Sequence, residues 1–220
     1  MHRIRIGKIK IKEPFSALSH LIGTGFALAS LVWLVTAAAQ RASLGRVISL
    51  AIFGGAMVAV YTASTLYHWL PLRPRQVKLM RSIDQAMIYL MIAGTATPVA
   101  MVALNGFARL LMLAVMWSAA SLGITLLAIP HIIHRSKMRR IKRSTHATLY
   151  LGMGWVSVLF AWPVIKAFSM MALAWLVAGG VSYTVGGLVY ALKKPNPLPR
   201  VVEFHEVFHL FVMVGSTCHV

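Results

Sequence analysis

Seven long apolar stretches alternate with short polar segments along the chain. The stretches cover residues 17–39, 47–70, 83–104, 107–129, 147–168, 170–192 and 204–220. Each is close to the roughly 20 residues that a helix needs to cross a bilayer, and the last, at about 17, is at the short end of that range. The pattern therefore predicts an all-α membrane protein with a seven-transmembrane helix bundle.

The composition supports the membrane assignment. Hydrophobic residues make up 59% of the 220 residues and charged residues only 12%. A soluble domain of this size exposes too much surface to be covered by so few charges. We expect a basic cytoplasmic N-terminal segment, residues 1–16, followed by a single seven-helix transmembrane domain, residues 17–220.

Basic residues are distributed unevenly between the polar segments. Of the 22 lysines and arginines, 18 lie before the first apolar stretch or in every second connection after it, and four lie in the other connections. By the positive-inside rule, this alternation predicts a cytoplasmic N-terminus and an external C-terminus. The net charge of +18 then reflects topology, so we expect membrane lipids as partners and no nucleic acid.

Four polar residues are expected to converge at the cytoplasmic side. His205 and His209 have the i, i+4 spacing that places two imidazoles on one helix face. In the predicted topology His68 ends the second helix, and Asp84 lies in the first turn of the third. Ionisable groups at such depth are costly unless they face the bundle interior and find partners.

Three neutral histidines around one cation, with a fourth position open, are typical of a catalytic zinc site. We therefore predict His68, His205 and His209 as zinc ligands, with Asp84 contacting the zinc-bound water directly or acting as a general base in acyl or amide hydrolysis. The alternative is that these are interfacial histidines that bond to headgroups or backbone carbonyls. Glu206 follows His205 directly and therefore points about 100° away from it on a helix, so we do not expect Glu206 to act as the catalytic base.

The remaining polar residues suggest supporting roles. Glu203 and Glu206 suit the positive dipole end of a helix, and Glu13 before Pro14 is a helix-start signal. We expect His20 to make a structural polar contact with the second or seventh helix rather than to bind metal. We expect three further histidines to face solvent or headgroups: His131, His134 and His146. For His219 we expect an outer-leaflet contact within the bundle.

Three motifs carry a resemblance to a known family. They are Glu13-x-x-Ser16-x-x-Ser19-His20-x-x-Gly23, then Ser64-x-x-x-His68 with Asp84 sixteen residues later, then Pro199 ahead of Glu203-Phe204-His205-Glu206-Val207-Phe208-His209 and the distal His219. In order and spacing they resemble the hemolysin III family, a bacterial branch of the progestin and adipoQ receptor superfamily. Ser16 stands where the first motif usually has Asn, which weakens any polar role expected there.

The resemblance implies a seven-helix fold in a bacterial inner membrane and a zinc ion held by His68, His205 and His209. It implies that Asp84 contacts the zinc-bound water, and it makes Ser64, His20 and Glu13 candidates for supporting roles. It also implies a ceramidase-like hydrolysis of a lipid amide or ester, with links to membrane homeostasis. Two alternatives are a non-enzymatic zinc-containing sensor or receptor, and a cytolytic protein, as the family name suggests.

The predicted topology can be tested with reporter fusions. A reporter at Lys137, in the most basic connection, should behave as cytoplasmic, and one beside Arg109 as external. The control is the same pair of reporters on a membrane protein of known orientation. The reverse pattern would place the histidines at the outer face and contradict the prediction.

Overall fold

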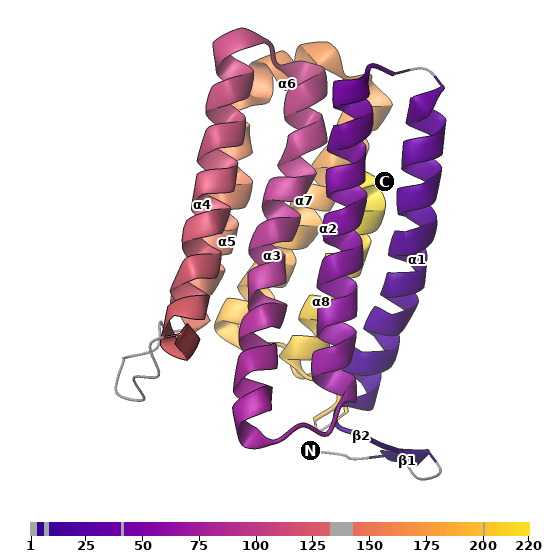
Figure 1. The fold of residues 1–220 in the computed structure, drawn as a ribbon, viewed down its shortest axis with the longest axis vertical. Helices are drawn as coiled ribbons and strands as arrows, with labels where there is room; N and C mark the ends of the chain where they lie inside the picture. Colours follow the sequence, from indigo (N-terminus) through magenta and orange to yellow (C-terminus); the bar gives the residue numbers. More distant parts are fainter. Residues whose placement is uncertain (1–3, 7–8, 41, 133–142, 200) are drawn as a thin grey trace.

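The computed structural model describes residues 4–6, 9–40, 42–132, 143–199 and 201–220. In these residues the helices form an elongated bundle whose axes run roughly side by side (Figure 1). The elements are β1 (Ile4–Ile6), β2 (Ile9–Ile11), α1 (Pro14–Ala39), α2 (Leu44–Trp69), α3 (Pro74–Ala103), α4 (Gly106–Ile132), α5 (Arg143–Val156), a 3₁₀ turn η1 (Ser157–Phe160), α6 (Ala161–Ala167), α7 (Met170–Leu192) and α8 (Phe204–His219).

Six helical segments of the described chain are long and apolar enough to cross a membrane. They are α1, α2, α3, α4, the segment formed by α5, η1 and α6, and α7. The last helix, α8, has 16 residues and packs against α7 and α1 inside the bundle. The all-helical membrane fold is thus confirmed, whereas the seventh crossing and the cytoplasmic N-terminus stay predictions.

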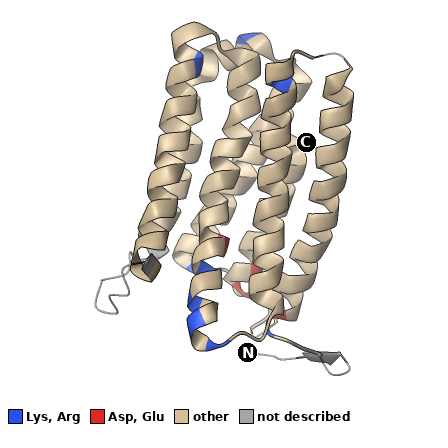
Figure 2. Ribbon diagram, viewed as in Figure 1, with Lys and Arg blue, Asp and Glu red and all other residues tan. Residues whose placement is uncertain are grey.

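Charged residues gather at the ends of the helices. Figure 2 shows most of the described lysines and arginines, and all four acids, toward the end of the bundle that also holds the N-terminus. Long apolar helix surfaces separate this end from the opposite one, where a few further basic residues lie. The arrangement is the one that a bilayer favours, because charges avoid its hydrocarbon core.

Helix α3 begins nine residues before the expected apolar stretch. Pro74 occupies its first turn, and the Gln76 side chain accepts a hydrogen bond of 3.0 Å from the Arg73 backbone N–H. These start signals extend the helix through a basic, polar turn that an apolar count misses. Asp84 therefore lies in the third turn of α3, so its expected first-turn position was wrong.

The basic N-terminal segment contains a hairpin that the sequence pattern did not predict. Strands β1 and β2 pair antiparallel, with Ile4 opposite Ile11. The Ile11 side chain is buried, and two residues later the Glu13 N–H donates a 3.0 Å hydrogen bond to the His68 carbonyl. The segment is thereby attached to the end of α2.

One histidine of the fourth-to-fifth connection is less exposed than expected. His146 is buried, and its Nδ1 lies 2.8 Å from the Tyr89 hydroxyl. Helix α5 turns this residue toward α3, so the expectation of exposure to solvent or headgroups was wrong for His146. His131 is partly exposed and forms a 2.8 Å hydrogen bond with the Ser82 hydroxyl. His134 lies outside the described residues.

Small residues allow close approach between helices in the bundle. A Cβ added to Gly123 on α4 would lie 2.4 Å from the ring of Tyr89 on α3. Tyr89 is buried and its hydroxyl is fixed to His146, so the ring has little freedom to move aside. The absence of a side chain at Gly123 therefore sets the distance between α3 and α4.

Replacing Gly123 by Ala should destabilise the bundle. Overpacking typically costs about 1–3 kcal/mol, and we expect a lower thermal unfolding midpoint in detergent. Gly25→Ala is the control, because a Cβ there meets nothing within 4 Å and Ala favours the helix. Equal midpoints for the two variants would show that the α3–α4 contact is not limiting.

Candidate metal centre

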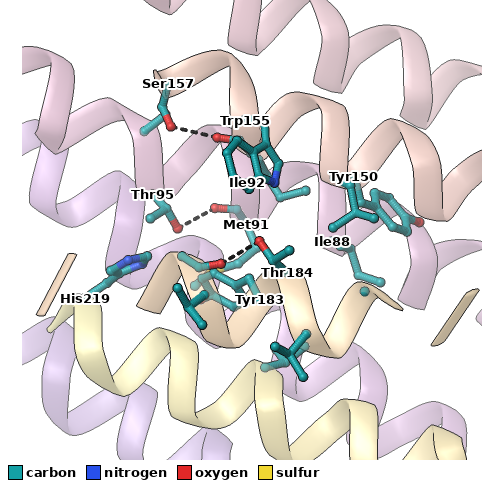
Figure 3. Close-up of a pocket in the computed structure, with 18 of the residues that line it drawn as sticks. Ile88, Met91, Ile92, Thr95, Tyr150, Trp155, Ser157, Tyr183, Thr184 and His219 are labelled. Carbon is teal, nitrogen blue, oxygen red and sulfur yellow. Dashed lines mark hydrogen bonds between the residues drawn. The ribbon is translucent and has the colours of Figure 1, made fainter. Parts of the chain in front are cut away.

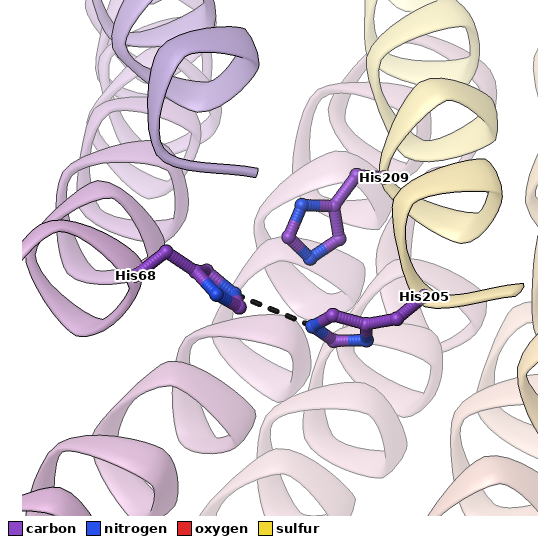
Figure 4. Close-up of side chains that lie close together, drawn as sticks. All are labelled: His68, His205 and His209. Atoms are coloured by element: carbon purple, nitrogen blue, oxygen red, sulfur yellow. Dashed lines mark hydrogen bonds between the residues drawn. The ribbon is translucent and has the colours of Figure 1, made fainter. Parts of the chain in front are cut away.

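Three histidines from two helices meet at the end of the bundle near the N-terminus. His68 comes from the last turn of α2, and His205 and His209 come from the first two turns of α8 (Figure 4). One nitrogen of each lies within 4.8 Å of the others. His68 and His209 are buried and His205 is partly exposed. The expected convergence of these three side chains is therefore observed.

The start of α8 is fixed by its own acidic residues. The Glu206 carboxylate accepts a 3.0 Å hydrogen bond from the Glu203 N–H, which closes a capping box at the helix N-terminus. This confirms the helix-start role expected for Glu206. Because the cap fixes the first turn, His205 and His209 are held one turn apart on the face toward α2.

The nitrogen positions match the donor set of a zinc site. His68 Nε2 and His205 Nε2 lie 3.3 Å apart. Two nitrogens that bind zinc tetrahedrally at about 2.0–2.1 Å would lie about 3.4 Å from each other. His209 also has a buried Nδ1 with no hydrogen-bond partner among the described residues. Three imidazoles at this spacing fit a metal ion.

Glu13 holds His68 through two contacts. Its carboxylate hydrogen-bonds His68 Nδ1, and its backbone N–H donates to the His68 carbonyl. When Nδ1 donates to a carboxylate, the lone pair of Nε2 is left for a metal, and the ring orientation is fixed. The sequence indicated Glu13 as a helix-start signal and as a candidate for a supporting role, but it did not predict the bond to His68. The one signal for a functional role was that Glu13 is among only four acidic residues in the chain.

Basic and aromatic residues surround the Glu13 carboxylate. Lys12 Nζ lies 3.3 Å from Glu13 Oε1 and 3.9 Å from the centre of the Tyr67 ring. Burial alone would raise the pKa of the Glu13 carboxyl, but the hydrogen bond and charge of His68, with the ammonium of Lys12, lower that pKa to about 2. Glu13 is therefore an anion at any physiological pH.

A second contact joins α1 to α8. The Ser16 hydroxyl donates a 2.8 Å hydrogen bond to Glu206 Oε1, and Ser16 is fully buried. The expectation that serine at this motif position weakens its polar role was thus wrong, since a short hydroxyl suffices where the helices are this close. The contact fixes the histidine-bearing turn of α8 against α1.

His20 lies against the histidine cluster without being part of it. Its ring stacks on His209 with centroids 3.9 Å apart and meets the edge of Tyr61 at 5.2 Å. The contacts join His20 to α2 and α8, the helices expected from the sequence. They are contacts between rings and not hydrogen bonds, because neither His20 nitrogen has a hydrogen-bond partner among the described residues. His20 therefore supports the orientation of the His209 ring.

Asp84 faces the same region from α3. It lines a cavity together with Ser64, His205 and His209. The Ser64 hydroxyl lies beside the Asp84 carboxylate. Asp84 thus lines the same cavity as His205 and His209 but does not belong to the group of three histidines whose nitrogens lie close together.

The cavity extends from the histidines into the interior of the bundle. Its volume is about 510 Å³, and its walls come mainly from α3, the α5–α6 segment, α7 and α8. Figure 3 shows side chains such as Ile88, Met91 and Ile92 along it, together with His219 and Tyr183. Only the tertiary structure reveals this cavity, since no local motif encodes it.

His219 lies on the same helix as the metal-site histidines but far from them. Its Nε2 is 3.2 Å from the Leu176 carbonyl of α7. A contact within the bundle was expected for this residue and is confirmed. A Cβ at Gly179 would lie 2.4 Å from this nitrogen, so the missing side chain makes room for the ring.

The chain is similar to proteins of a known family. A family model described as "Haemolysin-III related" matches residues 9–220. The chain is 32% identical to the "Hemolysin-3 homolog" of Bacillus subtilis, covering 94% of this chain and 90% of that protein. It is also 32% identical to "Hemolysin-3" of Bacillus cereus, covering 93% and 87%.

A more distant similarity links the chain to a receptor family. It is 26% identical over 68 residues to the "ADIPOR-like receptor IZH2" of Saccharomyces cerevisiae, which is 29% of this chain and 22% of that protein. The matched family model spans the helices that carry all three motifs. This chain therefore belongs to the hemolysin III family of integral membrane proteins, a relative of the progestin and adipoQ receptors.

Proposed function

We propose that this protein is a zinc-dependent hydrolase of the bacterial inner membrane that cleaves a lipid-derived amide or ester and so adjusts membrane composition. The observation that carries the proposal is the opening of the three-histidine cluster, beside Asp84, onto a cavity of about 510 Å³. Long apolar walls next to a hydrolytic donor set suit a substrate with an acyl chain.

His68, His205 and His209 would hold the ion, and Glu13 would fix His68 in the tautomer that binds it. Zinc bound there supplies Lewis-acid chemistry toward a carbonyl. Three protein ligands with a fourth position open are typical of a catalytic rather than a closed structural site, and the group of three described histidines supports this assignment.

Asp84 would act as the general base. In amide hydrolysis, water adds to the carbonyl carbon while its proton passes to the Asp84 carboxylate. The C–N bond then breaks, and the proton is returned to the leaving amine, so the products are a carboxylic acid and an amine. A base of this kind typically contributes about 10²–10⁴ in rate.

The membrane leaflet follows from the proposed orientation. We propose that α8 makes the seventh crossing and that the N-terminus is cytoplasmic, in line with the distribution of basic residues. The metal centre then lies at the cytoplasmic side. A substrate would enter from the inner leaflet with its polar group at the histidines and its chain in the cavity.

A non-enzymatic sensor or receptor is the alternative. Its support is the similarity to a yeast protein whose name describes it as a receptor. In that case the ion would be structural, the cavity would hold a ligand without cleaving it, and Asp84 would have no role in turnover.

Loss of any proposed ligand should lower zinc content sharply. Loss of an outer hydrogen-bond partner costs roughly 10–100-fold in metal affinity, and a direct ligand such as His209 should cost more. We expect His68→Ala, His205→Ala and His209→Ala to purify with little zinc and to unfold at lower temperature, because metal binding is coupled to folding. The measurement is elemental analysis with thermal unfolding.

His131→Ala is the matched control, since His131 lies at the same end of the bundle and bonds Ser82 instead. It should retain the wild-type zinc content. Unchanged zinc in His209→Ala would reject the proposed ligand set.

Asp84→Asn separates the enzyme from the sensor. Asn keeps the shape of the side chain but cannot accept the proton, so turnover should fall about 10²–10⁴-fold while zinc content is kept. The assay is hydrolysis of long-chain acyl amides and esters in liposomes by the zinc-loaded protein. Lys78→Gln is the control, because Lys78 lies on the same helix as Asp84 but is exposed and does not line the cavity.

Hydrolysis at wild-type rate by Asp84→Asn would exclude Asp84 as the base. Complete absence of zinc-dependent turnover in the wild type, with acyl ligands still bound, would favour the sensor.

A further inference from the structure

We propose that the cavity contains a second polar subsite about 21 Å along α8 from His205, formed by the Tyr183 hydroxyl and His219 Nδ1, which binds a hydroxyl group on the far end of a long-chain lipid. This inference rests on the proposed lipid-binding role of the cavity and adds a chemical feature of the ligand. It concerns residues that take no part in metal binding.

Tyr183 of α7 and His219 of α8 are neighbours that both line the cavity. Their ring centroids are 5.5 Å apart, and Figure 3 shows both side chains on the cavity wall. His219 Nδ1 and the Tyr183 hydroxyl are buried, and neither has a hydrogen-bond partner among the described residues. The Tyr183 hydroxyl lies near that of Ser216, which is already paired with the Tyr61 hydroxyl.

The other hydroxyls shown on the cavity wall are already satisfied. Thr95 donates to the Met91 carbonyl at 2.8 Å, Thr184 to Gly180 at 2.8 Å and Ser157 to Gly154 at 2.7 Å. Each uses a carbonyl of its own helical segment (Figure 3). Tyr183 and His219 differ from them, and buried polar atoms without partners are costly enough to be rare.

The chemistry of the two groups selects the ligand. The Nε2 of His219 faces the Leu176 carbonyl, so it carries the hydrogen, and Nδ1 of the neutral ring is then an acceptor. The Tyr183 hydroxyl can donate as well as accept. A ligand hydroxyl satisfies both, because it donates to Nδ1 while accepting from Tyr183.

The spacing selects the length of the ligand. His219 follows His205 by fourteen residues on α8, which corresponds to about 21 Å along the helix axis. The cavity wall between these two histidines includes apolar side chains such as Ile88, Ile92 and Val212. The cavity therefore fits a long hydrocarbon chain with one polar group at the histidine cluster and a hydroxyl at its other end.

Competition binding with two fatty acids tests the subsite. The zinc-loaded protein in nanodiscs is titrated with palmitate and with ω-hydroxypalmitate against a fluorescent fatty acid. In the wild type, ω-hydroxypalmitate should bind at least as tightly as palmitate. Tyr183→Phe keeps the ring and should weaken ω-hydroxypalmitate about tenfold, the effect of leaving a buried hydroxyl without a partner, with palmitate unchanged.

Thr184→Val is the matched control. Thr184 neighbours Tyr183 and lines the cavity, but its hydroxyl bonds its own helix, so neither affinity should change. His219→Leu provides a second variant and should again weaken only ω-hydroxypalmitate.

The same ratio of the two affinities in wild type and Tyr183→Phe would overturn the polar subsite while leaving the cavity's lipid-binding role intact. Failure of the wild type to bind either acid would instead contradict that role, and with it the basis of the proposal. The two failures are therefore distinguishable.

Discussion

The pairing of Glu13 with His68 is the interaction on which the rest of the site depends. An imidazole at the end of an apolar helix has no fixed orientation of its own. Glu13 fixes it by binding Nδ1 with its carboxylate and the His68 carbonyl with its backbone N–H. Because Glu13 directly precedes α1, the same contacts hold the N-terminal segment and α1 against the end of α2. His68 Nε2 is consequently turned toward His205 of α8.

Contacts between α1 and α8 also hold the site together. Ser16 binds the carboxylate of Glu206, the residue that caps α8, and His20 stacks on His209. Three helices thus meet at a point where each contributes a polar group and each polar group has a neighbour on another helix. In a low-dielectric environment such contacts are specific, because an unpaired polar group costs more there than in water.

The cavity provides space for a ligand next to the histidine cluster. Close packing at positions such as Gly123 excludes space between α3 and α4, whereas an open volume is left where α3, the α5–α6 segment, α7 and α8 face one another. The cavity is largely apolar, with polar groups at the histidine cluster and again at Tyr183 and His219. The proposed hydrolase and the proposed second subsite therefore describe two positions in one ligand site.

The sequence by itself determined the membrane fold, the helix order and the residues that converge. Apolar length and hydrophobic composition are properties of local segments, and the i, i+4 spacing of His205 and His209 follows from the helix period. The sequence also predicted His68 as their partner, because residues at the same end of adjacent spans are at the same depth. It did not predict the start of α3, since a basic helical turn resembles a loop when only hydrophobicity is counted.

Only the tertiary structure decided which polar residues touch. The bonds of Glu13 to His68, of Ser16 to Glu206 and of His146 to Tyr89 join residues far apart in the chain, and such pairs depend on the rotation of each helix about its axis. The cavity depends on many helical segments at once, since its lining residues come from α1 through α8. Hydrophobic patterns constrain the depth of a residue in the membrane but leave that rotation open, because every face of these helices is apolar; packing of side chains between helices fixes it.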